Sequence, residues 1–155
     1  MFLGIDQSIT QTGVVILDGN GKVIHSEVAS FTKYDHQERL IKIYTYFSDL
    51  AKRYPKMKFG VEDYAFNSFY SREKLGELRG IIELAFIHNN IDYKIVPIKV
   101  HRKSTYGNGN IKKDEAANMA MKLYGVRFVT LDEFDAFSIA YFLFLDNKNK
   151  KSSNF

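Results

Sequence analysis

The chain has 155 residues, the length of one domain that can bury a full hydrophobic core. Its 45% hydrophobic content excludes extensive disorder, and its formal net charge of +4 permits a polyanionic partner without requiring one. The absence of cysteine excludes disulfides and thiolate metal sites, and no apolar run reaches the ~18–20 residues of a membrane span, so we expect a cytoplasmic protein.

The first predicted strand ends in a carboxylate. Phe2, Leu3 and Ile5 are apolar, as a buried strand requires, and Asp6 follows directly. Holding an acid at the end of a buried strand is costly unless a cation meets it. A lone acid here would be an ordinary surface residue, but three more acids stand at the ends of predicted elements.

Hydrophobic periodicity and turn residues predict the elements that follow. In chain order these are hairpin strands over 14–17 and 22–28, a helix capped by Asp35 and ending before Pro55, a strand over 57–61, a helix over 70–88, a strand over 93–97, a basic loop over 99–113, a helix over 116–124 and a last helix over 130–145. We predict one domain over residues 1–146 and a flexible basic tail over 147–155.

Acids also end the second central strand and begin the last helix. Glu62 follows the strand over 57–61. Thr130 and Glu133 have the spacing of a capping box, which places Asp132 and Asp135 in the first helical turn and on one face. Acids in the first turn of a helix commonly serve only to interact with the positive end of the helix dipole. For Asp132 and Asp135 taken alone, this purely structural role stays open.

The four acids are predicted to meet at one place. Adjacent strands bring Asp6 and Glu62 to one edge of a sheet, and a helix packed on that sheet can deliver Asp132 and Asp135 to the same edge. Carboxylates this close raise one another's pKa, so they need a cation. Oxygen ligands in this number suit Mg²⁺ or Mn²⁺ rather than zinc, and two such ions about 3.5–4 Å apart can drive phosphodiester cleavage.

A series of short motifs runs through almost the whole chain: Gly4-Ile5-Asp6 with Thr12-Gly13, Val61-Glu62, Leu75-Gly76-Glu77-Leu78-Arg79-Gly80 and Asp132-Glu133-Phe134-Asp135-Ala136. This series resembles that of RuvC, the Holliday junction resolvase family of bacteria and some of their phages. The resemblance implies a ribonuclease H-like α/β fold with a central mixed five-stranded sheet and helices on both faces. It also implies a Mg²⁺-dependent endonuclease that works as a homodimer on four-way DNA junctions, with Asp6, Glu62, Asp132 and Asp135 as its metal ligands.

The resemblance assigns further residues by position. Lys99 matches the family's active-site lysine, and either Lys112 or Lys113 matches a second basic residue. The expected DNA contacts are Tyr64, Phe66, Arg102, Lys103, Lys112 and Lys113, and the expected dimer interface is Leu75, Gly76, Leu78, Arg79 and Gly80. Ala65 stands where the family has a DNA-wedging Phe, so the family's preference for particular cleavage sequences is not carried over. The compact size also suits a phage member, which would act in the cytoplasm of its bacterial host.

Three other interpretations remain. The Gly4-Ile5-Asp6 stretch with Thr10, Thr12 and Gly13 also resembles the phosphate loop of actin-like sugar kinases and chaperones, but those proteins need two such domains and far more than 155 residues. The RuvC-like YqgF group, linked to ribosomal RNA processing, would act on RNA. A non-catalytic junction-binding module is the third, and the four intact acids argue against it. A metal-dependent nicking assay on branched DNA, duplex and RNA hybrid separates these interpretations.

Overall fold

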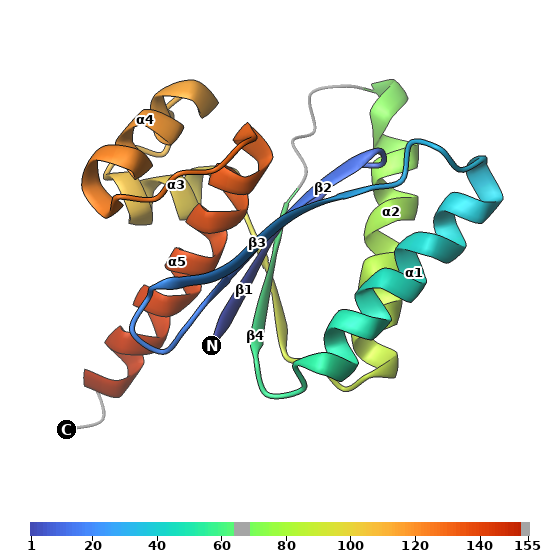
Figure 1. Cartoon of the computed structure of the whole chain (residues 1–155), viewed down its shortest axis with the longest axis horizontal. Helices are drawn as coiled ribbons and strands as arrows, with labels where there is room; N and C mark the ends of the chain where they lie inside the picture. Colours follow the sequence, from blue (N-terminus) through green and yellow to red (C-terminus); the bar gives the residue numbers. More distant parts are fainter. Residues whose placement is uncertain (64–68, 153–155) are drawn as a thin grey trace.

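A mixed five-stranded sheet forms the centre of the computed structural model, which describes residues 1–63 and 69–152 (Figure 1). Its strands are β1 (Phe2–Asp6), β2 (Gln11–Leu17), β3 (Val23–Ser30), β4 (Lys58–Glu62) and β5 (Tyr93–Val96). They lie in the order β3-β2-β1-β4-β5. The β1 strand pairs antiparallel with β2 and parallel with β4, which makes the sheet mixed.

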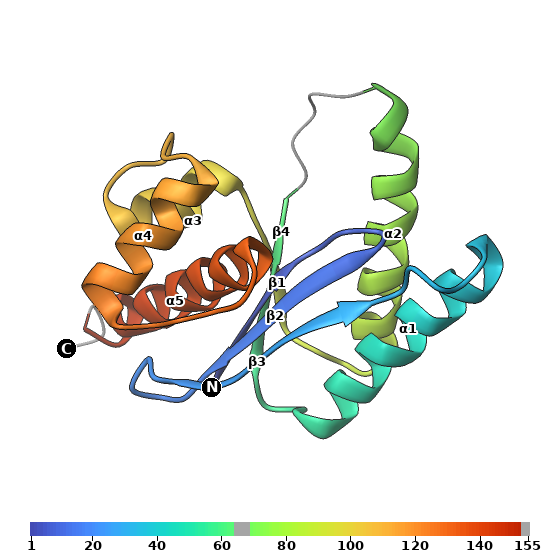
Figure 2. The same ribbon diagram turned by 45° about the horizontal axis from the view of Figure 1, so that its top comes forward.

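Helices cover both faces of this sheet (Figures 1 and 2). One face carries α1 (His36–Arg53) and α2 (Phe69–His88), and the other carries α3 (Ile98–Tyr106), α4 (Lys113–Tyr124) and α5 (Leu131–Ser152). The central strand β1 is therefore covered on both sides, and each of its five residues is buried. The predicted fold class is confirmed.

Aromatic rings fill the space between the sheet and its helices. Phe86 of α2 packs edge-on against Phe59 of β4 and Phe47 of α1, with ring centroids 5.0 and 5.8 Å apart. On the opposite face, Phe144 of α5 packs edge-on against Phe2 of β1, with ring centroids 5.8 Å apart. These contacts pack α2 and α5 against opposite faces of the sheet.

Two glycines let α5 lie directly on the sheet. A Cβ at Gly4 would collide with the carbonyl oxygen of Ala136, and a Cβ at Gly13 would collide with that of Asp132. Only glycine allows the backbones to approach this closely. Because Gly13 pairs with Asp6 in the β1–β2 ladder, this contact sets the start of α5 beside the end of β1.

The predicted basic loop over 99–113 is wrong for its first half, which is the helix α3. Pro97 is its N-cap and Gly107, with a left-handed φ of 79°, ends it. The helix forms because residues 98–106 contain neither Gly nor Pro, and it is anchored by the burial of His101, Thr105 and Tyr106. The helix predicted over 116–124 likewise begins earlier, at Lys113.

The chain after residue 146 also differs from the predicted flexible tail, because α5 continues to Ser152. Lys150 pairs with Asp146 one turn earlier at 3.3 Å, and the ammonium group of Lys148 lies 4.6 Å from the centre of the Phe144 ring. These contacts extend the helix past its apolar part. Across the described residues, none of the helices is long and apolar enough to cross a membrane.

Candidate active site

The ends of β1 and β4 place two carboxylates side by side. The strands pair in parallel with Ile5 opposite Val61, so Asp6 and Glu62 leave the sheet at the same edge. Asp135 reaches this edge from α5, and one oxygen from each of the three acids lies within 4.8 Å of the others. Asp6 and Asp135 are buried and Glu62 is half-buried. Three of the four acids that were expected to meet are therefore close together, whereas Asp132 is not part of this group and is linked to Asp6 and Asp135 through Lys113.

The start of α5 is capped in the predicted way. Glu133 Oε2 accepts hydrogen bonds from the backbone N–H groups of Thr130 and Val129 at 3.0 and 3.1 Å. In return, Thr130 Oγ1 accepts the N–H of Glu133 at 3.3 Å. This reciprocal cap fixes the first turn, from which Asp132 and Asp135 both reach the same lysine.

That lysine, Lys113, lies among the acids. Its Nζ is 2.8 Å from carboxylate oxygens of Asp6 and Asp132 and 3.1 Å from one of Asp135. Burial alone would lower the pKa of Lys113, but the charges of Asp6 and Asp135 outweigh it and raise the pKa. The ammonium group therefore stays charged and marks the point where the acids attract a cation.

Arg102 forms a second ion pair with the carboxylate of Asp135, in addition to that of Lys113. Its Nη2 donates to the two carboxylate oxygens at 3.1 and 2.9 Å, and its Nη1 donates to the carbonyl oxygen of Ile111 at 2.9 Å. A guanidinium held by a backbone carbonyl and paired with both oxygens fixes the orientation of the carboxylate. Asp135 is therefore positioned before any ligand arrives.

Burial and mutual repulsion oppose ionisation of two acids. Burial, followed by the charge of Glu62, raises the pKa of Asp6 to about 8. Burial, followed by the charge of Asp135, raises the pKa of Glu62 to about 8. Glu62 Oε2 is buried and accepts no hydrogen bond within the part of the chain that the structure describes. These oxygen ligands fit a hard divalent cation, which would favour their ionised forms.

The other basic residues named from the sequence lie outside this cluster. Lys99, Lys103 and Lys112 are exposed, and none of them forms an ion pair with a carboxylate in residues 1–63 or 69–152. The expected DNA contacts Tyr64 and Phe66 fall outside the described residues. The structure therefore favours Lys113, of the two lysines left open, as the basic residue nearest the acids.

Two of the expected dimer contacts face the sheet instead of solvent. Leu78 is 2% exposed and belongs to the core. Arg79 donates from Nη2 to the carbonyl oxygen of Glu62 at 2.7 Å. These two side chains hold α2 to β4, so they are corrected from interface contacts to internal ones. Leu75 is partly buried against the same core, whereas Gly76 and Gly80 have open space beside them.

Arg102 was expected only as a DNA contact, and no role was expected for His101, which is buried beside Glu62. One feature of the sequence could have predicted the positions of Arg102 and His101 in the site. Pro97 and Gly107 bracket a segment of helical length, and a helix there brings Arg102 and His101 near the core-facing positions Thr105 and Tyr106.

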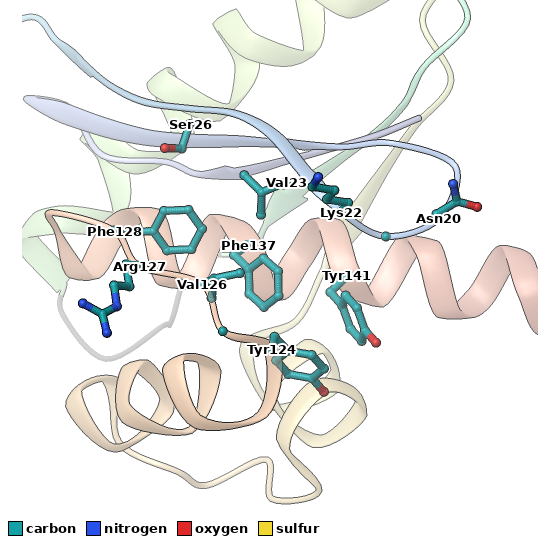
Figure 3. Close-up of a pocket in the computed structure, with 12 residues that line it drawn as sticks. Asn20, Lys22, Val23, Ser26, Tyr124, Val126, Arg127, Phe128, Phe137 and Tyr141 are labelled. Atoms are coloured by element: carbon teal, nitrogen blue, oxygen red, sulfur yellow. The ribbon is translucent and has the colours of Figure 1, made fainter.

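A separate pocket of about 420 Å³ lies between the β2–β3 turn and the connection from α4 to α5 (Figure 3). Aromatic rings line it, among them Tyr124, Phe128 and Tyr141, with Lys22 and Arg127 also among its residues. Its described lining contains no carboxylate, so the acid-based chemistry considered above does not belong there.

The order and direction of the strands, with acids at the ends of β1 and β4 and on the last helix, define a protein of the ribonuclease H-like class. The family model described as "Crossover junction endodeoxyribonuclease RuvC" matches residues 2–142. The chain belongs to this family, whose members are metal-dependent endonucleases.

Curated relatives agree with this assignment, and solved structures have the same fold. The RuvC protein of Brachyspira hyodysenteriae is 29% identical to this chain, and the alignment covers 89% of each protein. The RuvC protein of Aliarcobacter butzleri is 30% identical, and the alignment covers 89% of this chain and 94% of the relative. The structure of Thermus thermophilus RuvC has a TM-score of 0.77 at 22% identity and 95% coverage of both chains. The same protein in complex with a Holliday junction substrate has a TM-score of 0.78 at 18% identity and 94% coverage of both chains.

Proposed function

We propose that the chain is a structure-selective endonuclease that resolves four-way DNA junctions by paired nicks. Membership of the RuvC family and the carboxylate cluster of Asp6, Glu62 and Asp135 are what support it. A double-helical substrate carries a dense row of phosphates, and the formal net charge of +4 agrees with such a partner. A DNA substrate also supports our proposal that the protein acts in the cytoplasm.

We propose Asp6, Glu62, Asp132 and Asp135 as the ligands of Mg²⁺ or Mn²⁺, with two ions in each site. When bound, such ions supply Lewis-acid stabilisation of the charge that develops on the phosphodiester. Asp132 is supported by its shared contact with Lys113, which links it to Asp6 and Asp135. Arg102 holds the carboxylate of Asp135 in its orientation.

Lys113 is proposed to stabilise phosphate charge in the transition state, because its charged Nζ lies within 3.1 Å of three of the acids. Lys113→Ala is expected to slow nicking about 10²-fold or more at saturating enzyme. Lys103→Ala, an exposed control, is expected to leave that rate unchanged and to lower the salt slope of binding by about one unit. Single-turnover nicking and a salt series of dissociation constants measure both effects.

The family position of Lys99 remains a competing assignment. If Lys99→Ala slows saturated nicking as much as Lys113→Ala does, transition-state stabilisation is shared between the two lysines. If Lys113→Ala nicks normally once binding is saturated, its proposed role is wrong.

The protein is proposed to act as a homodimer through α2. Gly76 and Gly80 have open space where a Cβ would stand, and Leu84 and Ile87 are 45% and 60% exposed. These four residues follow helical spacing and form one outward stripe where a second α2 can approach closely. Two copies related by a two-fold axis match the approximate two-fold symmetry of a junction and its paired nicks.

Gly80→Arg is expected to convert a dimer to a monomer without unfolding the chain, because the new side chain enters open space in the single copy. Met121→Arg on α4, 40% exposed on the other face of the sheet, is the control and is expected to remain dimeric. Analytical ultracentrifugation measures the mass. A Gly80→Arg variant that remains dimeric would move the interface away from α2.

The proposed function is tested by nicking assays in Mg²⁺ on four substrates of matched sequence: a four-way junction, a flap, a linear duplex and an RNA–DNA hybrid. The junction is expected to be nicked fastest, on opposing strands. Faster cleavage of the RNA hybrid would favour a YqgF-like role instead. Junction binding without cleavage of any substrate would favour a non-catalytic module.

A further inference from the structure

His101 is a fully buried residue of α3 that contacts one of the candidate metal ligands. Its Nδ1 lies 2.8 Å from Oγ of Ser138, and its Nε2 lies 3.4 Å from Oε2 of Glu62. Neither Nε2 nor Oε2 has a hydrogen-bond partner within the described ranges, and both are buried. Buried polar atoms are nearly always paired in folded proteins, so two that face each other indicate a hydrogen bond that forms when Glu62 is ionised.

The neighbours of His101 determine where its proton lies. An ionised carboxylate can only accept, so Nε2 must carry the proton that is donated to Glu62. Nδ1 is then an acceptor, and the single hydroxyl proton of Ser138 must point to Nδ1 at 2.8 Å instead of to Oγ1 of Thr105 at 3.4 Å. Thr105 donates from Oγ1 to the carbonyl oxygen of Ser138 at 3.1 Å, which ties α3 and α5 together around the ring. A neutral imidazole with its proton on Nε2 satisfies both contacts.

The backbone of Glu62 is held independently of its side chain. Its carbonyl oxygen accepts hydrogen bonds from Nε2 of Gln7 and from Nη2 of Arg79, each at 2.7 Å. The end of β4 is therefore fixed, and the remaining freedom of Glu62 is rotation of its side chain. A donor aimed at one carboxylate oxygen removes that freedom.

We propose that His101 is a positioning residue that donates from Nε2 to Oε2 of Glu62 and leaves the other carboxylate oxygen free to bind the metal. The inference rests on the proposed function, because it assigns the residue that orients one of the proposed ligands. Outer partners of this kind typically affect metal affinity by about 10–100-fold, since an unoriented ligand must be ordered when the ion binds.

The test compares His101→Leu with His101→Gln in the protein without DNA. Leucine is an apolar side chain without a donor, whereas the amide Nε2 of glutamine lies the same number of bonds from Cβ as Nε2 of histidine and can donate to Glu62. Electron paramagnetic resonance of free Mn²⁺ measures the affinity directly. We expect His101→Leu to bind Mn²⁺ about tenfold more weakly or worse, and His101→Gln to recover most of the loss.

A second measurement does not depend on how the variants fold. The ¹⁵N spectrum of the wild-type imidazole with Mg²⁺ bound is expected to show a protonated Nε2 and an unprotonated Nδ1. Equal Mn²⁺ affinity in wild type and His101→Leu, equal losses in both variants, or a protonated Nδ1 would each overturn the inference.

An Asp6→Asn arm separates this inference from the proposed function. If Asp6→Asn loses Mn²⁺ binding while His101→Leu retains it, only the role of His101 is wrong. If Asp6→Asn binds Mn²⁺ as the wild type does, Asp6 is not a metal ligand, and the proposed metal-dependent function is contradicted.

Discussion

Asp6→Asn is expected to lower the rate of junction nicking roughly a thousandfold while leaving junction binding intact or tighter. The asparagine side chain nearly matches aspartate in shape, but it removes a charged ligand from a site whose ion contributes several kcal/mol of transition-state stabilisation. Binding is preserved because the change also removes a negative charge that repels phosphates. Single-turnover nicking and gel-shift titration of the same junction measure the two effects separately.

Asp49→Asn is the matched control, since Asp49 is an exposed acid on α1, away from the cluster. It is expected to nick at the wild-type rate. Asp135→Asn is a poorer test than Asp6→Asn, because it leaves the partly buried Arg102 without its anionic partner and destabilises the fold as well. Wild-type nicking by Asp6→Asn would show that the acids are not catalytic.

Gly4→Ala is expected to destabilise the fold by about 3 kcal/mol or more, among the largest effects of any single methyl group added to this chain. The new Cβ would collide with the carbonyl oxygen of Ala136 and lie 2.6 Å from the backbone nitrogen of Ala140, and neither backbone atom can turn aside. Either α5 or β1 must shift. Thermal unfolding should show a melting temperature lower by about 10 °C.

Gly19→Ala provides the comparison, because no atom lies within 4 Å of the position a Cβ would take there. It is expected to unfold at close to the wild-type temperature. If Gly4→Ala is as stable as Gly19→Ala, the close contact between β1 and α5 is not what holds the helix on the sheet, and the placement of Asp132 beside Asp6 needs another cause.

Much of this fold could be predicted from the sequence, because it depends on short-range sequence patterns. The alternation of apolar residues and turns predicts the strands, and the spacing of Thr130 and Glu133 predicts the cap that begins α5. Asp6 and Glu62 could be paired because the acids that end neighbouring parallel strands must leave the sheet at one edge. Each of these features depends on residues close in sequence or on a simple rule of sheet geometry.

The remaining parts of the site depend on contacts between distant segments. Lys113 is separated from Asp6 by 107 residues, and nothing in its own neighbourhood distinguishes it from Lys112. His101 meets Ser138 across 37 residues, and only the docking of α3 on α5 brings them together. The basic composition of residues 99–113 predicted a loop, because charge indicates exposure on average while the buried residues of α3 are few.

We propose that the carboxylate cluster is a metal centre rather than a network of ion pairs neutralised by Lys113. Anomalous diffraction from crystals of the protein grown with Mn²⁺ tests it most directly. We expect strong anomalous density bounded by carboxylate oxygens of Asp6, Glu62 and Asp135, with Nζ of Lys113 moved away from its present position among them. Crystals in which Lys113 keeps its contacts with the acids, and no anomalous density appears there at millimolar Mn²⁺, would contradict it.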